Sequence, residues 1–353
     1  MTAPEITQYK VALAFEDGVT RFIDCAEDET IADAAYQAKI NIPFDCRDGA
    51  CGTCKAFCDA GDFEEGDYVD DALSADEAAD GYILACQTKP LTDMVVHIAS
   101  TSEMAKTGTQ TFEGEIVDLT RLGSSIYRLG VKVDNNEALN FLAGQYVNIT
   151  VPGSEDHRSY SFSSDVSDDV ATFLIKHTPS GLMSTYLDER AKVGDRLKLE
   201  GPVGSFFLRE PLDPILLLAG GTGLAPIMAI LEKLSRDEKL DVPVRLIYGA
   251  TFADELVELE RLDGFKESLP DFDYTTVLAD PEAEHERKGY VTDHMDTSEH
   301  LHDGEADVYL CGPPPMVEAV RTYLDAQATP PRNFYFEKFN PTVPSAPKES
   351  QEV

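Results

Sequence analysis

The chain has 353 residues, of which 42% are hydrophobic, enough for two or three domains with their own apolar cores. Its formal net charge is −36 and its pI is near 4.3, which argues against nucleic acids and anionic membranes as partners. No apolar run is long enough to span a membrane and no signal peptide precedes the first predicted strand, so we expect a cytoplasmic protein, and a monomer.

The negative charge is concentrated towards the N-terminus. The stretch 59–80 holds ten carboxylates and no basic side chain. A general acidic excess is explained by solubility or by adaptation to a salty cytoplasm. The local excess could instead steer docking to a basic patch on a redox partner. The composition is compatible with both explanations.

The first hundred residues predict a small sheet with one helix. Two alternating stretches, 9–15 and 19–25, are separated by a Glu-Asp-Gly hairpin signal. The stretch 30–39 predicts a helix with Thr30 as its N-cap. Two later strands and a Ser/Thr-rich linker are expected at 82–88, 94–98 and 100–110.

Four cysteines have the plant-type spacing of a [2Fe–2S] cluster, in which a C-x4-C-x2-C run at 46–54 is followed by a remote fourth cysteine. Gly49 and Gly52 allow the backbone of this loop to bend and to approach the sulfurs closely. A structural zinc ion shares the C-x2-C element, but zinc sites usually have two short cysteine pairs. We therefore predict a cluster with the ligands Cys46, Cys51, Cys54 and Cys86.

The remaining cysteines are Cys25, Cys58 and Cys311. Cys25 and Cys58 lie in alternating apolar stretches and are expected to be buried as small hydrophobic residues. Cys58 could compete as the fourth cluster ligand, but it lies along an apparent strand that leads away from Cys54. Lone thiols and thiolate ligands suit a reducing cytosol.

From residue 111 to 212 the pattern changes to short strands and turns. Regular short strands without long helices predict an antiparallel β-barrel. The strands are expected at 112–117, 126–133, 145–151, 171–177 and 196–200.

From residue 213 the pattern changes again. The continuous apolar run 215–219 predicts a strand that is buried on both faces. Helix-like stretches then alternate with further strands, which predicts a doubly wound α/β domain. The expected organisation is therefore 1–99, a linker at 100–110, a barrel at 111–212, an α/β domain at 213–340 and a disordered tail at 341–353.

Two glycine-rich turns follow strands of the predicted α/β domain. The turn 220–226 contains Gly221, Thr222, Gly223 and Pro226, a composition that lets a backbone approach a pyrophosphate at a helix N-terminus. The second turn holds Cys311, Gly312 and Pro313. Ligands of such sheets bind outside the carboxyl ends of the strands, so both turns are expected to face one crevice. The alternative for either turn alone is an ordinary strand-to-helix connection.

The stretch 157–163 in the barrel region has side chains that could bind a phosphate and a flat ring that contains nitrogen. Arg158 can pair with phosphate, Tyr160 can lie along a flat ring, and the Ser161 hydroxyl can bond a ring nitrogen. The alternative is an ordinary strand with an exposed arginine. A further anion-binding helix start is possible at 181–184.

The order of these motifs resembles the ferredoxin-NADP reductase superfamily, in the branch with an N-terminal ferredoxin. It is most similar to the reductase components of the benzoate, toluate and anthranilate 1,2-dioxygenases. The resemblance runs from about residue 9 to 340 and includes 41–43, 143–148, 158–164, 285–292 and 336–339. It implies a β-grasp [2Fe–2S] ferredoxin domain, an FAD-binding antiparallel β-barrel and a doubly wound NAD-binding α/β domain.

The resemblance also implies roles for individual residues. Ser161, Thr222 and Cys311 would lie where flavin and nicotinamide meet and would be catalytic. Phe339 would cover the other face of the flavin, with Phe334 or Phe336 as alternatives. The FAD contacts would come from Arg158, Ser159, Tyr160, Ser161, Lys176, His177, Thr178, Gly181, Met183 and Ser184, and the nucleotide contacts from Gly221, Thr222, Gly223, Pro226, Asp254, Cys311, Gly312 and Pro313.

The mechanism implied by the resemblance passes electrons from NADH to FAD, then to the [2Fe–2S] cluster and then to the Rieske centre of a separate oxygenase. One alternative is a reductase for a di-iron monooxygenase of the phenol or methane type. A second alternative, of a different class, is an electron-carrier ferredoxin fused to a nucleotide sensor without catalytic activity. The sequence does not state which aromatic acid is oxidised, because that pocket lies in another protein.

NADH rather than NADPH is the expected donor. After the predicted strand 246–250 the chain runs through Asp254 and Glu255 without an arginine or lysine. Carboxylates there would repel a 2′-phosphate and could accept a hydrogen bond from a ribose hydroxyl. The nearest basic residues that could fold over the site are Arg287 and Lys288.

Overall fold

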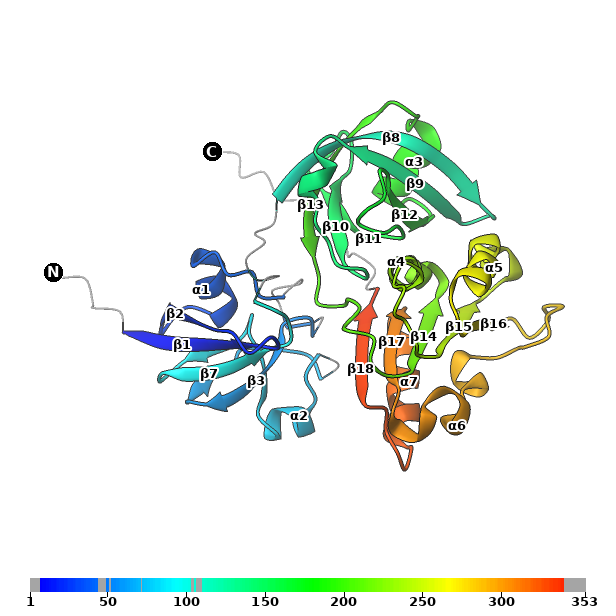
Figure 1. Ribbon diagram of the computed structural model, residues 1–353. Coiled ribbons are helices and arrows are strands. Elements are labelled where there is room, and N and C mark those ends of the chain that lie inside the picture. Colours follow the sequence, from blue (N-terminus) through cyan, green and yellow to red (C-terminus); the bar gives the residue numbers. More distant parts are fainter. Residues whose placement is uncertain are drawn as a thin grey trace.

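The computed structural model describes residues 7–43, 49–50, 52–70, 72–102, 105 and 110–339. They form three domains, here called the N-terminal, barrel and C-terminal domains (Figure 1). The N-terminal domain has a five-stranded mixed sheet in the order β2-β1-β7-β3-β5. Its elements are β1 (Gln8–Phe15), β2 (Thr20–Ala26), α1 (Ile31–Gln37), β3 (Lys55–Ala60), β4 (Phe63–Glu64), α2 (Ala75–Ala79), β5 (Tyr82–Leu84), β6 (Lys89–Pro90) and β7 (Met94–Ile98).

The predicted hairpin and helix of the N-terminal domain are present. The apolar side chains of β1 face a core that includes Val11 and Leu13, both completely buried. Helix α1 begins after Thr30, whose Oγ1 accepts a hydrogen bond from the Asp33 backbone N–H at 3.2 Å. The short helix α2 was not predicted, although Ser74 and Glu77 form a reciprocal capping box at its start.

The barrel domain is a six-stranded antiparallel sheet in the order β11-β10-β13-β8-β9-β12. A bridge between Phe162 and Phe173 joins its two end strands and closes the sheet into a barrel. Phe141 stacks on Phe162 with ring centroids 3.6 Å apart, so aromatic rings fill the interior. The elements are β8 (Gln110–Leu122), β9 (Ile126–Val133), η2 (Asn136–Ala138), β10 (Tyr146–Thr150), β11 (His157–Ser161), β12 (Ala171–Lys176), α3 (Leu182–Glu189) and β13 (Arg196–Val203).

The C-terminal domain is a five-stranded parallel sheet in the order β16-β15-β14-β17-β18. All residues of β14 are buried, as the apolar run predicted. The elements are β14 (Ile215–Gly220), η3 (Gly221–Gly223), α4 (Leu224–Ser235), β15 (Val244–Ala250), η4 (Ala253–Glu255), α5 (Leu259–Ser268), β16 (Phe272–Leu278), η5 (Val291–His294), α6 (Thr297–His300), η6 (His302–Gly304), β17 (Asp307–Gly312), α7 (Pro314–Asp325) and β18 (Asn333–Lys338).

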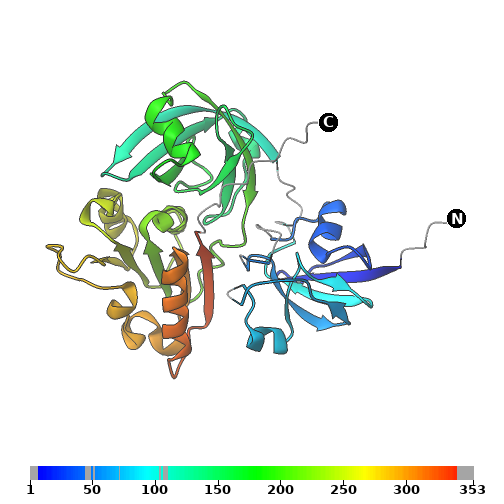
Figure 2. The ribbon, with the colours of Figure 1, turned by 180° about the vertical axis from the view of Figure 1, so that it is seen from behind.

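The edge strand β18 of the C-terminal domain faces the N-terminal domain, and the barrel domain lies beyond the carboxyl ends of the parallel strands (Figures 1 and 2). Ion pairs join the domains, for example Arg236 with Asp165 at 2.9 Å and Lys176 with Glu255 at 3.2 Å. Over the described residues, no helix combines the length and apolar character needed to cross a membrane. In both views the three domains meet around the carboxyl end of β18.

Candidate functional site

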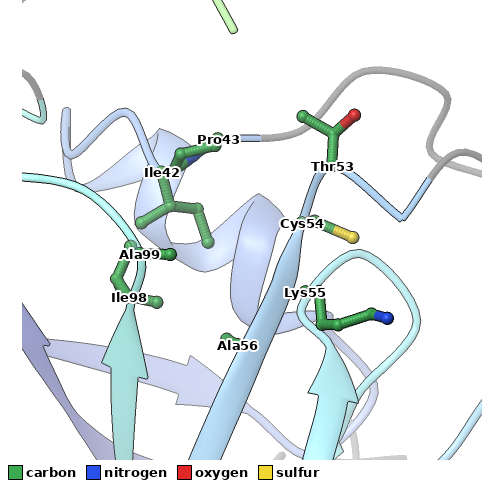
Figure 3. Close-up of a pocket in the computed structure, with 8 residues that line it drawn as sticks. All are labelled: Ile42, Pro43, Thr53, Cys54, Lys55, Ala56, Ile98 and Ala99. Atoms are coloured by element: carbon green, nitrogen blue, oxygen red, sulfur yellow. The ribbon is translucent and has the colours of Figure 1, made fainter. Parts of the chain in front are cut away.

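Two of the four predicted cluster ligands lie within the described residues, and they meet. Cys54 immediately precedes β3 and Cys86 follows β5, and these two strands pair with Lys55 opposite Leu84. Both cysteines are buried, and their sulfurs are 3.2 Å apart. Two sulfurs that bind one tetrahedral metal ion at about 2.3 Å lie within about 4 Å of each other, so this pair suits a shared metal centre. Figure 3 shows Cys54 and Lys55 at the start of β3.

The predicted ligands Cys46 and Cys51 lie outside the described residues. The loop around them nevertheless shows why it needs glycine. Gly49 has a φ of +73°, and a Cβ there would lie 2.5 Å from the Asp67 carbonyl oxygen. Gly52 also has a φ of +73°, and a Cβ at this position would lie 3.1 Å from the Ala72 carbonyl oxygen. The two positive-φ glycines and the two converging thiols fit a [2Fe–2S] cluster.

Of the cysteines outside the proposed ligand set, Cys25 is buried as expected, whereas Cys58 is only partly buried. Cys58 lies on β3, where its Sγ contacts the Ala60 carbonyl oxygen at 3.5 Å, away from the pair formed by Cys54 and Cys86. Burial raises the pKa of the Cys25 thiol to about 12, so Cys25 is a neutral core residue. This placement supports Cys86, rather than Cys58, as the fourth ligand.

The flavin motif lies on β11, which pairs with β10. Arg158 donates a hydrogen bond to the His157 carbonyl at 2.6 Å, and among the described residues no carboxylate lies within ion-pair distance of its guanidinium. Ser159 donates to the Asn148 side-chain oxygen at 2.7 Å. Burial raises the pKa of Tyr160, which is therefore neutral at pH 7. A guanidinium without a carboxylate partner beside a neutral phenol fits a phosphate and a flat ring.

The second predicted flavin segment follows β12. His177 contacts Asp188 at 2.6 Å, and the Thr178 N–H donates to the Ser184 hydroxyl at 2.9 Å. Met183 is buried in the barrel core, and Gly181 is the N-cap of α3. The Ser184 oxygen accepts the Thr178 bond and still has its O–H to donate, so Ser184 and the N–H groups at the start of α3 could both contact a pyrophosphate here.

The two glycine-rich turns of the C-terminal domain are in direct contact, as the crevice rule predicted. Strands β14 and β17 are neighbours, and a Cβ on Gly223 would lie 2.1 Å from the Cys311 carbonyl oxygen. Thr222 is partly exposed within the first turn, while Pro226 is buried in the first turn of α4. Gly312 and Pro313 start the connection into α7. The turns form one surface at the carboxyl ends of the central strands.

Replacing Gly223 by alanine should destabilise the C-terminal domain by about 1–3 kcal/mol, because the new methyl group collides with backbone rather than with a mobile side chain. Gly264→Ala is the matched control: its Cβ would meet no atom within 4 Å on helix α5, and alanine favours a helix by about 0.5–1 kcal/mol. Thermal unfolding of both variants measures the difference. Equal midpoints would show that the two turns do not pack as described.

Glu337 is a functional candidate that sequence reasoning missed. Ser161 donates a hydrogen bond to Glu337 Oε2 at 3.4 Å, and the Cys311 thiol lies 4.0 Å from the same oxygen. Cys311 is completely buried, and burial together with the Glu337 charge raises its thiol pKa, so the thiol keeps its proton. Two of the three predicted catalytic residues therefore converge on one carboxylate from β18.

The alternation of β18 separates the three candidate phenylalanines. Phe334 and Phe336 pack on the core that includes Val317 of α7, and their ring centroids are 5.3 Å apart. Phe339 packs on the opposite core, and its N–H donates to the Gly312 carbonyl at 3.0 Å. Only Phe339 lies on the side that carries Glu337, which supports it over the two alternatives as the residue that covers a flavin.

The predicted nucleotide-selecting carboxylates differ in their surroundings. Asp254 is exposed after β15. Glu255 is buried, where it accepts hydrogen bonds from the Thr251 and Phe252 N–H groups and pairs with Lys176. The expectation that Glu255 faces a nucleotide is therefore wrong, because its carboxylate caps its own turn and joins two domains.

Comparison with known proteins identifies the domains. The chain matches family models for a 2Fe-2S iron-sulfur cluster binding domain over 14–91, an oxidoreductase FAD-binding domain over 113–208 and an oxidoreductase NAD-binding domain over 217–322. The toluate 1,2-dioxygenase electron transfer component of Pseudomonas putida is 49% identical over 94% of this chain and 98% of its own length. This chain belongs to the family of electron transfer components of aromatic-ring 1,2-dioxygenases. It is an oxidoreductase with 2Fe-2S, FAD-binding and NAD-binding domains.

Other relatives have the same organisation. The 2-halobenzoate 1,2-dioxygenase electron transfer component of Burkholderia cepacia is 46% identical over 95% of this chain and 99% of its own length. Among solved structures, the Amycolatopsis cytochrome P450 reductase GcoB has a TM-score of 0.70 and 32% identity, covering 94% of this chain and 99% of its own. The ferredoxin reductase in carbazole 1,9a-dioxygenase has a TM-score of 0.64 and 27% identity, covering 95% of this chain and 100% of its own. The predicted order of three domains is confirmed.

Proposed function

We propose that the chain accepts a hydride from NADH at FAD and delivers the electrons singly, through its [2Fe–2S] cluster, to the Rieske centre of a separate aromatic-ring oxygenase. FAD can accept two electrons at once and pass them on one at a time. The protein positions its cofactors and tunes them. The observation that carries the proposal is the convergence of Ser161, Glu337 and Cys311 where the barrel and C-terminal domains meet. The boundaries 1–99, 111–212 and 213–340 are proposed for the three domains.

The residues around this junction would act as follows. Arg158 would bind phosphate and Tyr160 would lie against the ring system. Ser161 would hold the flavin's reactive edge, and Thr222 and Cys311 would seat the nicotinamide beside it. Cys311 is fully buried, so a nicotinamide seated against it would be shielded from water on that side, which would protect a hydride from competing reactions.

The oxygenase partner is proposed from the relatives. The toluate and 2-halobenzoate dioxygenase components are 49% and 46% identical to this chain, whereas the propane 2-monooxygenase reductase component of Gordonia is 32% identical. A reductase for a monooxygenase is therefore the second candidate. The carboxylates at 59–80, apart from Glu77, which pairs with Lys55, are proposed to steer the N-terminal domain to a basic surface of the oxygenase.

Anaerobic mixing with NADH tests the internal electron path. The flavin absorbance should bleach first, and the reduced-cluster EPR signal should follow. Bleaching of the flavin without any cluster reduction would contradict the proposed path. Failure of NADH to bleach a fully loaded flavin would favour the nucleotide-sensor alternative.

Asp254→Ala should lower the preference for NADH over NADPH by roughly tenfold, because removing one exposed carboxylate relieves the repulsion of a 2′-phosphate. The matched control is Asp241→Ala, another exposed aspartate that precedes β15 at the opposite end of the sheet. Steady-state kcat/KM with both nucleotides gives the preference. A wild-type enzyme that prefers NADPH, or an unchanged preference in the variant, would show that Asp254 does not select the donor.

A further inference from the structure

A ladder of alternating charges crosses from the N-terminal domain to the C-terminal domain. The Lys55 ammonium is 2.6 Å from Glu77 Oε1, and Arg321 Nη2 is 3.7 Å from the same oxygen. Arg321 then approaches Glu318 Oε1 at 4.0 Å, and this oxygen is 2.7 Å from Lys338 Nζ. The charge ladder therefore consists, in spatial order, of Lys55, Glu77, Arg321, Glu318 and Lys338.

The two ends of the charge ladder are neighbours in sequence of residues with proposed functions. Lys55 directly follows Cys54, one of the proposed cluster ligands (Figure 3). Lys338 directly follows Glu337 and precedes Phe339, the residues proposed to lie at the flavin. Arg321 also lies over the ring of Phe336 on β18, 5.6 Å from its centroid. The ladder thus links the start of β3 to the end of β18, the strand that faces the N-terminal domain in Figures 1 and 2.

The side chains of the charge ladder are partly buried, which strengthens the electrostatic attraction between them. Side-chain exposure is 18% for Lys55, 28% for Glu77 and 22% for Arg321, so solvent screens them less than it screens a surface pair. Burial raises the pKa of Glu77, but hydrogen bonds from Lys55 and Ser74 outweigh it and leave the pKa below its usual value. Glu77 is therefore charged at pH 7 and faces both domains.

A second contact holds the N-terminal domain at a different point. Arg209, in the connection between the barrel and C-terminal domains, pairs with Glu16 at 3.4 Å. Its guanidinium also lies over the rings of Phe207 and Tyr335, at 3.5 and 4.6 Å from their centroids. Two separate contacts limit rotation of one domain against another, and the ladder is the contact beside Cys54.

We propose that Glu77 and Arg321 are positioning residues for electron transfer, which hold the start of β3, beside Cys54, against α7 and the end of β18 so that electrons pass from flavin to cluster. This inference rests on the proposed electron path. It predicts that breaking the ladder slows the flavin-to-cluster step and loosens domain docking, while hydride transfer from NADH to the flavin is unchanged.

The test compares Arg321→Glu and Glu77→Gln with wild type as fully loaded proteins. Ferricyanide reduction reports hydride transfer to the flavin, and cytochrome c reduction reports electrons that leave through the cluster. R321E places a third carboxylate beside Glu77 and Glu318, so cytochrome c reduction should fall about tenfold, while ferricyanide reduction stays within about twofold. E77Q should give a smaller fall in the same direction. The matched control is Arg245→Gln, which removes an arginine of 27% exposure whose partner, Asp271, is in the same domain.

Small-angle X-ray scattering provides a readout that does not depend on turnover. The radius of gyration should increase in R321E and stay at the wild-type value in R245Q. The double variant E77Q/R321Q should be no more impaired than the worse of the single variants E77Q and R321Q, because both changes break one contact. If R321E lowered both activities equally, the variant Glu77→Lys would be compared next, since Glu77 belongs to the N-terminal domain. A fall in cytochrome c reduction alone in E77K would support the positioning role.

Wild-type cytochrome c reduction and an unchanged radius of gyration in R321E and E77K would overturn the positioning role. A different result would count against the proposed function itself: wild-type protein that reduces neither acceptor with NADH. The scattering comparison would still decide whether the ladder docks the domains.

Discussion

Cys86→Ser should eliminate the visible absorption and the reduced EPR signal of the cluster while flavin content is kept. Cys86 is buried with its sulfur 3.2 Å from that of Cys54, so serine removes one of two converging ligands. Even changes outside the ligand sphere cost about 10- to 100-fold in metal affinity, and loss of a ligand should cost at least as much. NADH-dependent cytochrome c reduction should fall by the same order, with ferricyanide reduction retained.

Cys58→Ser is the matched control for this experiment. Cys58 is partly buried on β3, the strand that Cys54 immediately precedes, where it packs on the core and its sulfur contacts the Ala60 and Gly61 carbonyl oxygens. Its cluster signal should match that of wild type. A native signal in C86S together with its loss in C58S would reverse the assignment of the fourth ligand.

Arg158→Ala should release FAD. A charge-assisted hydrogen bond to phosphate contributes roughly 1.5–3 kcal/mol, so affinity should fall by about 10- to 150-fold. Among the described residues Arg158 has no carboxylate partner that its loss would leave unpaired, so the barrel should stay folded. Flavin content after gel filtration and a titration of the apoprotein with FAD measure the effect.

The control is Arg196→Ala on β13 of the same barrel, where the guanidinium pairs with Asp134. That variant should bind FAD as wild type does. If R158A kept full flavin occupancy with unchanged affinity, the phosphate contact would have to come from another residue of the barrel.

The parts of the site that could be predicted from sequence are those with local rules. The cysteine spacing indicates a cluster without knowledge of the fold, and the pairing of β3 with β5 then brings Cys86 to Cys54. The contact between Gly223 and Cys311 follows from a general rule for parallel sheets, because their turns end neighbouring strands. The first prediction needed only the cysteine spacing, and the second needed only the position of each turn after a strand.

The parts that could not be predicted depend on contacts between distant segments. Ser161 and Glu337 are 176 positions apart, and no local pattern indicates that they share a hydrogen bond. The alternation of residues 333–339 could have separated Phe334 and Phe336 from the face that carries Glu337. Glu255 was misjudged because its carboxylate turns back to its own backbone, which composition does not reveal.

The most direct test of the proposed electron path is reconstitution with a purified benzoate-type oxygenase component. With NADH, oxygen and benzoate, the chain should support formation of the dihydroxylated product in proportion to the NADH consumed, and C86S should support none. The account would be contradicted if the loaded chain reduced cytochrome c but gave no product with this oxygenase and instead supported turnover by a di-iron monooxygenase hydroxylase.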